Sequence, residues 1–149
     1  MDLKERLALE FNEALKGGDK LKVSVLRLLR TTVKNREVEK RGPLNEAEVI
    51  QAIVSSCKQR REAIAEFRQA GREDLASKEE AELKILESFL PEPLSLEELK
   101  GKVASAIAET GASSMKDMGK VMAHLLPQVA GRADGKLTSQ LVREALAKS

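Results

Sequence analysis

The sequence predicts an all-α fold, and three observations lead to that prediction. Apolar residues recur with the helical period of about 3.6 residues along the whole chain. Of the 149 residues 42% are hydrophobic but only 2% are aromatic, so a core has to be built from Leu, Ile, Val, Ala and Met. Glycines, prolines and capping residues separate the periodic segments, as expected where helices begin and end. The length suits one domain or a domain with a small satellite.

The first two helices are expected over residues 3–16 and 20–41. Gly17-Gly18 ends the apolar stripe of the first helix, and Asp19 is placed to cap the second. The second helix carries a wide apolar stripe, which predicts burial on two sides. Its members are Leu21, Val23, Val25, Leu26, Leu28, Leu29, Thr32 and Val33.

Two further helices complete the N-terminal part. Gly42-Pro43 breaks the second helix, and Asn45 with Glu48 three residues later indicates a capping box that opens a long third helix. Gly71 stops the third helix, and a fourth helix with apolar residues from Leu75 to Leu90 ends at Pro91. We therefore expect an elongated bundle of about four helices over residues 1–90.

A stiff boundary at Pro91-Glu-Pro93 separates this bundle from a smaller C-terminal domain, residues 94–149. Ser95 with Glu98 predicts a capping box for a fifth helix, which Gly111 closes. A sixth helix opens at Ser114 with Asp117 and extends to Pro127, and a seventh covers residues 137–146. The sequence thus predicts three short helices in this domain.

The charges are unevenly distributed, although the formal net charge is only +2. Residues 20–41 hold eight Lys or Arg against two Glu, whereas residues 73–87 hold six acidic residues against two Lys. The basic helix either follows a phosphate backbone or pairs with the acidic helix, in the bundle or in a neighbouring copy, and structural pairing is favoured. No aromatic residue interleaves with the basic run, which disfavours recognition of unpaired bases.

No catalytic or metal-binding constellation is evident. His124 is the sole histidine and adjoins Leu125 and Leu126, so we expect a partly buried packing residue. Cys57 falls on the apolar stripe of the third helix and is expected to be a small core residue. Without a Cys/His cluster we expect no metal site, no cofactor and no enzymatic activity.

The chain carries no sign of export or membrane insertion. The start, Met1-Asp-Leu-Lys-Glu-Arg6, lacks the apolar run of a secretory signal, and a single cysteine forms no internal disulfide. Charges interrupt every apolar segment well before the roughly 18 residues that a membrane span needs. We therefore expect a cytoplasmic protein with no membrane association.

Residues 111–146 are the best candidates for a binding site. Glycines and cations cluster there at two predicted helix starts, where backbone N–H groups and a missing Cβ favour the approach of phosphates. The candidate nucleic-acid-binding residues are Lys116, Gly119, Lys120, Gly131, Arg132, Gly135 and Lys136. A structural interpretation stays open beside this one: the glycines pack helices or form caps, and the lysines are solvated charge.

The same segment resembles a known family. Asp117-Met-Gly-Lys-Val-Met122 and Gly131-Arg-Ala-Asp-Gly-Lys136 are similar to the signature of the GatB/YqeY family. The resemblance covers nearly the whole chain and includes Arg27-Leu-Leu-Arg30, Lys58-Gln-Arg-Arg61 and Leu86-Glu-Ser-Phe-Leu-Pro91. The chain resembles a free-standing YqeY-like member.

The resemblance implies contact with RNA. In that family the domain forms the helical tail of the tRNA-dependent amidotransferase B subunit, where it helps hold the outer corner of tRNA. It implies no transamidation by this chain, which lacks the catalytic portion; at most it implies an association with a carbon–nitrogen ligase that uses glutamine as amido-N donor. The tail usually has Asn-Pro where this chain has Asp134-Gly135, so entry into the last helix is expected to differ.

The leading interpretation is a noncatalytic helical module that binds tRNA or a tRNA-handling enzyme. The alternative is a protein-interaction or oligomerisation module that binds no nucleic acid. A helix-turn-helix that reads DNA ranks last, because the final helix begins with few base-reading side chains. The sequence contains no indication of the oligomeric state.

Overall fold

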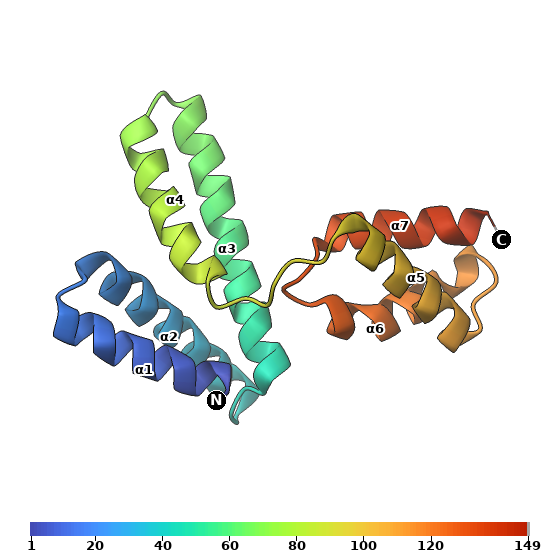
Figure 1. Ribbon diagram of the computed structural model, residues 1–149, viewed down its shortest axis with the longest axis horizontal. Helices are drawn as coiled ribbons and strands as arrows, with labels where there is room; N and C mark the ends of the chain where they lie inside the picture. The colour runs from blue at the N-terminus through green and yellow to red at the C-terminus, as the bar shows by residue number, and fades with distance from the viewer. Residues whose placement is uncertain (149) are drawn as a thin grey trace. The chain divides into compact units, whose positions relative to one another are not determined.

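The computed structural model describes residues 1–148 and confirms the all-α prediction: these residues form helices and no strand (Figure 1). The elements in chain order are α1 (Leu3–Gly17), α2 (Lys20–Lys40), α3 (Glu46–Gln69), α4 (Glu73–Glu87), α5 (Leu96–Thr110), the short 3-10 helix η1 (Met115–Asp117), α6 (Met118–Val129) and α7 (Gly135–Ala147). The chain divides into two compact units, Met1–Leu90 and a second that begins at Pro91.

The predicted capping residues start the helices as expected. Asp19, Asn45 and Ser95 each accept a hydrogen bond from a backbone N–H in the first turn of α2, α3 and α5. Asn45 and Ser95 form reciprocal capping boxes, and Asp2 forms a third one at α1 that the sequence analysis did not single out. Local side-chain chemistry therefore determines where these helices begin.

Three helix ends differ from prediction. α2 ends at Lys40, one residue before the predicted end, and Arg41 adopts the left-handed conformation after it, with φ of 64°. α4 ends at Glu87, and the chain continues in turns that bury Phe89 before it reaches Pro91. α6 runs through Pro127 to Val129, because a proline in the last turn removes one amide donor without stopping the helix there.

The first unit consists of two helical hairpins, α1–α2 and α3–α4 (Figure 1). α2 packs on both α3 and α4, so the core of this unit forms where the hairpins meet. Leu26 is fully buried there, whereas Leu28 is 57% exposed. The predicted burial of α2 on two sides is therefore wrong at Leu28. The buried core residues are Leu3, Leu7, Val25, Leu26, Leu29, Val33, Leu44, Val49, Ala52, Ile53, Cys57, Leu86 and Phe89.

The second unit is a three-helix unit in which α5, α6 and α7 all contact one another. Its buried core residues are Leu99, Val103, Ala106, Val121, Leu125, Val129, Val142 and Leu146. Thr138 is also fully buried, and its hydroxyl donates to the carbonyl of Asp134, so no polar group is lost on burial. This core holds the helix starts at η1–α6 and at α7 in place.

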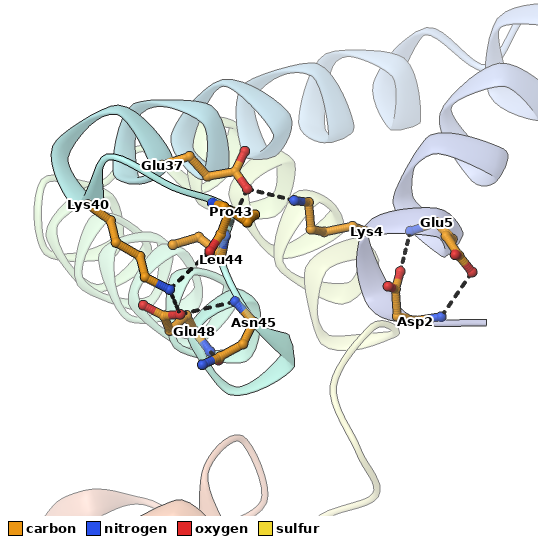
Figure 2. Close-up of polar contacts among 9 residues, drawn as sticks. All are labelled: Asp2, Lys4, Glu5, Glu37, Lys40, Pro43, Leu44, Asn45 and Glu48. Atoms are coloured by element: carbon orange, nitrogen blue, oxygen red, sulfur yellow. Dashed lines mark hydrogen bonds and ion pairs between the residues drawn. The ribbon is translucent and has the colours of Figure 1, made fainter.

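A polar network joins the ends of α1, α2 and α3 (Figure 2). The Glu37 carboxylate accepts from Lys4 Nζ at 2.6 Å and from the backbone N–H of Leu44 at 2.8 Å. Lys40 Nζ lies 2.5 Å from Glu48, the residue that completes the capping box of α3. The hydrogen bonds from Lys4 and then from Leu44 hold the pKa of Glu37 below its ordinary value.

We predict that Leu26→Ala lowers the free energy of unfolding of the first unit by about 2 to 5 kcal/mol, because it removes a buried side chain and leaves a cavity. Leu28→Ala is the matched control on the same helix and should change the stability by less than about 0.5 kcal/mol. Urea unfolding followed by circular dichroism at 222 nm measures both. Equal losses in the two variants would contradict the packing described for α2.

We predict that Glu37→Gln reduces the acid sensitivity of the fold. Because the pKa of Glu37 is lowered in the folded chain, its contribution is complete above the ordinary Glu pKa of about 4.3 and is lost as the pH falls through the lowered value. The native chain should therefore lose more stability than the variant between neutral pH and pH 3. Urea unfolding at a series of pH values tests this, and parallel curves would contradict it.

Candidate nucleic-acid interface

The first predicted helix start is formed by η1 and the first turn of α6. The Asp117 carboxylate accepts from the backbone N–H groups of Ser113 and Ser114 at 2.9 and 3.4 Å. These two hydrogen bonds, and then the charge of Lys120, lower the pKa of Asp117. The carboxylate is thus directed at the backbone, while Lys116 and Lys120 are exposed on the same short segment.

The second predicted helix start is held more tightly. Gly131 takes up a left-handed conformation with φ of 74°, as a cap or turn glycine does. Arg132 is partly buried: its Nε donates to the carbonyl of Glu92 at 2.8 Å, and its own carbonyl accepts from the amide of Leu94. Asp134 caps α7 by accepting from the amide of Lys136. Arg132 therefore holds the segment before α5, and its guanidinium forms no ion pair in residues 1–148.

The structure does not bring the two helix starts together. α6 has 12 residues and separates them by about 18 Å, since an α-helix rises about 1.5 Å per residue. η1 contacts α7, and in Figure 1 the η1 segment lies at the end of the unit where α7 finishes. The residues Lys116, Gly119 and Lys120 thus form one site, and Gly131, Arg132, Gly135 and Lys136 lie at the other end of the unit.

The surroundings of the glycines distinguish a phosphate-binding role from a structural role in packing or capping. A Cβ placed on Gly119 or on Gly135 would meet no atom within 4 Å. Gly119 is also exposed, so close helix packing does not account for it. Gly131, with its positive φ, fits the structural interpretation of a cap. Gly119, the glycine of the first site, leaves an open surface between Lys116 and Lys120.

The lysines of the predicted site are not neutralised by the fold. Lys116, Lys120 and Lys136 are exposed, and none forms an ion pair with a residue in the described part of the chain. Asp117 is the acidic residue within η1; its carboxylate accepts from backbone donors, stays negatively charged and interacts with Lys120, so the two lysines of this segment exceed its negative charge by one. Both positions therefore present positive charge to solvent.

The expected pairing between the basic helix and the acidic helix is wrong within the first unit. Five of the six acidic side chains of α4 pair instead with arginines of α3, the helix next to it in the hairpin, and Asp74 pairs with Arg72. The ion pairs are Arg60 with Glu79 and Glu82, Arg61 with Glu87, and Arg68 with Glu73 and Glu80. On α2, Lys22 pairs with Glu10 of α1, and Lys40 pairs with Glu48 of α3. The other cations of α2 have no ion pair in residues 1–148.

Sequence reasoning missed an aromatic residue beside these cations. Phe11 of α1 lies under two guanidinium groups of α2, with Arg30 Cζ 4.7 Å and Arg27 Cζ 5.8 Å from the ring centroid. These distances suit cation–π contacts. A usable signal was present, because a tight turn at Gly17-Gly18 folds α1 back along α2 and places residue 11 near residue 27.

The two residues considered for chemistry have other surroundings. His124 is exposed, with Nε2 2.5 Å from Glu109, so the expected packing role is wrong. Cys57 is buried as predicted, and burial raises the pKa of its thiol. No three His, Cys, Asp or Glu side chains converge in residues 1–148 in a way that would hold a metal ion. No helix in that range is long and apolar enough to cross a bilayer.

Comparison with known proteins identifies the family. The family described as Yqey-like protein matches residues 4–146, so this helical chain belongs to the YqeY-like family. A relative from Kluyveromyces lactis, "Altered inheritance of mitochondria protein 41, mitochondrial", is 31% identical over 131 residues, which cover 85% of this chain and 66% of that protein.

Two further relatives carry the same name. The protein from Vanderwaltozyma polyspora is 32% identical over 82 residues, covering 54% of this chain and 44% of its own length. The protein from Pyrenophora tritici-repentis is 26% identical over 144 residues, covering 95% of this chain and 79% of its own length. The chain thus spans between about two fifths and four fifths of these relatives, and none of the three is named as an enzyme.

These names correct the expected location. The expectation of a cytoplasmic protein is contradicted, because the relatives are named as mitochondrial proteins. The absence of a secretory signal, of a disulfide and of a membrane span does not distinguish the cytoplasm from the interior of an organelle.

We predict opposite effects for alanine at two glycines. Gly119→Ala should stabilise the second unit by about 0.4 to 1 kcal/mol, because the site is open and helical and alanine restricts the unfolded chain. Gly131→Ala should destabilise it by about 1 kcal/mol or more, because alanine is strained at positive φ. Urea unfolding of each variant measures both effects. Destabilisation by Gly119→Ala would show that Gly119 has a packing role.

Proposed function

We propose that this chain is a noncatalytic helical module that binds tRNA, with the exposed segment of η1 and the first turn of α6 as its contact in the second unit. The observation that carries the proposal is the pair of exposed, unpaired lysines, Lys116 and Lys120, on either side of the open surface at Gly119. The resemblance to the tail of the tRNA-dependent amidotransferase B subunit supports tRNA as the polyanion.

The geometry favours contact with phosphates. Lysine is a flexible point charge that can follow phosphate oxygens. The backbone N–H groups of Ser113 and Ser114 already donate to Asp117, so the contact proposed here depends on the lysines. No aromatic side chain belongs to this segment, so it offers no platform for an unpaired base. Lys136 at the other end of the unit is too far away to share a single phosphate with Lys120, and a folded RNA that reaches both has to span the length of α6.

The double variant Lys116→Gln, Lys120→Gln should bind tRNA more weakly and with a smaller salt dependence. Losing two phosphate contacts makes the slope of log affinity against log salt less steep by roughly 1.4 to 1.8. Binding of fluorescently labelled tRNA, followed by anisotropy from 50 to 300 mM salt, measures affinity and slope together. Arg132 is left unchanged, because its guanidinium holds the Glu92 carbonyl and its loss would disturb the fold.

The matched control is Lys100→Gln, Lys102→Gln. It removes the same charge from α5, and neither lysine forms an ion pair in residues 1–148. If both double variants lost the same affinity for tRNA and the same salt slope, the loss would be due to net charge, and η1–α6 would not be the binding site. A native chain that ignores tRNA at low salt, but retains a protein partner after ribonuclease treatment, would instead support the protein-interaction alternative.

A further inference from the structure

The first unit contains a pocket between α1 and α2 that the proposed function does not use. Its volume is about 530 Å³. The residues that line it are Lys4, Leu7, Ala8, Phe11, Arg27, Arg30, Thr31, Val33, Lys34 and Glu37. Four of these side chains are cations and one is a carboxylate, so the pocket has a clear positive excess.

The carboxylate does not neutralise the row of cations on α2. Glu37, one of the lining residues, accepts hydrogen bonds from Lys4 of α1 and from the amide of Leu44 (Figure 2). Arg27, Arg30 and Lys34 form no ion pair with any residue that the structure describes, and all three are exposed. The acidic helix α4, the largest source of carboxylates in this unit, is bound to α3.

The three cations without an ion pair form a row along α2. Positions 27, 30 and 34 recur at helical spacing on one face of α2. Seven residue steps along the helix extend about 10 Å, which is longer than a single phosphate group. A row of this length is suited to a polymeric anion, because a small phosphate would contact only one or two of its members.

Phe11 holds two of these cations in position. Its ring carries the Arg30 and Arg27 guanidinium groups at 4.7 and 5.8 Å, which draws both heads over α1. A guanidinium placed on a ring keeps its N–H edge available for bidentate contacts with phosphate oxygens. The same contacts cover the ring, so Phe11 positions the arginines and is not available as a free platform for a base.

The charges of the pocket favour a polyanion over a protein helix as its occupant. Leu7 and Val33 belong to the core and are 2% and 6% exposed, so the apolar surface left in the pocket comes from other lining residues such as the partly buried Ala8 and Phe11. The one aromatic group, Phe11, lies under the arginines. An amphipathic helix needs an apolar surface to bury, whereas a phosphate backbone needs unpaired cations.

We infer that the α1–α2 pocket is a second anion site, in which Arg27, Arg30 and Lys34 bind consecutive phosphates of an RNA backbone. The identity of the ligand rests on the proposed function, whereas the site itself rests on the geometry of the first unit alone. Because the contacts are made to phosphates, the pocket recognises charge and backbone shape and not base sequence.

The test uses the full chain and the double variant Arg27→Gln, Arg30→Gln, with Lys16→Gln, Lys20→Gln as matched control. Lys16 and Lys20 lie in the same hairpin, are exposed, do not line the pocket and form no ion pair in the described residues. The arginine variant should bind labelled tRNA at least about tenfold more weakly at 50 mM salt, with the salt slope reduced by roughly 1.4 to 1.8, and the control should change much less. Equal losses in the two variants would overturn the inference.

Phe11→Leu keeps every charge and an apolar side chain at the core, so it separates positioning from net charge. It should weaken tRNA binding about threefold to tenfold without changing the salt slope as much as the arginine variant does. Circular dichroism shows whether each variant retains its helices. Full affinity in a folded Phe11→Leu chain would contradict the positioning role.

The arms separate this inference from the proposed function. Weak binding by the arginine variant but not by Lys116→Gln, Lys120→Gln supports the pocket and overturns the site in the second unit. The reverse result overturns the pocket alone.

Tripolyphosphate, added to labelled protein and followed by NMR of arginine Nε–H groups, should shift the signals of Arg27 and Arg30. Shifts with tripolyphosphate but no tRNA binding would overturn RNA as the ligand, and no shift would overturn the site. A ribonuclease-resistant protein partner lost with the arginine variant would assign the pocket to a protein.

Discussion

The pairing of α4 with α3 determines the charge distribution of the first unit. α4 is strongly acidic, and its carboxylates bind Arg60, Arg61 and Arg68 on the neighbouring helix. Arg60 is the least exposed of the three and contacts both Glu79 and Glu82, the latter mostly buried. A buried charge requires a partner, so these carboxylates are not available to α2. The positive face of α2 therefore follows from the pairing of two other helices.

In the second unit, hairpin geometry separates residues that are close in the sequence. Two consecutive antiparallel helices begin at opposite ends, so the starts of α6 and α7 are separated by a full helix length. Glycines and cations that lie close in the sequence are thereby divided between two surfaces. In the first unit the same geometry brings Phe11 of α1 beneath Arg30 of α2, because the turn between those helices is short. Proximity in the sequence is a poor measure of proximity within a hairpin.

Sequence reasoning reached those features that depend on local chemistry. The caps at Asn45 and Ser95 involve residues three positions apart, and the burial of Cys57 follows from helical periodicity, so both were predictable. Features that depend on the choice of partner were not: periodicity does not reveal that Leu28 faces outward, nor which basic helix the acidic helix binds. Two signals were overlooked: the capping box of Asp2 with Glu5, and the hairpin register that joins Phe11 to Arg27.

The candidate sites differ in how the fold treats their charges, and this difference bears on function. Arg132 donates a hydrogen bond to the Glu92 carbonyl and so stabilises the fold, whereas Lys116 and Lys120 are exposed and form no ion pair in residues 1–148. Arg27 and Arg30 lie between these cases, since the ring of Phe11 restrains them without neutralising them. A cation restrained in this way loses less conformational freedom on binding than a free lysine does. For equal numbers of phosphates, the α1–α2 pocket should therefore contribute more to affinity than the start of α6.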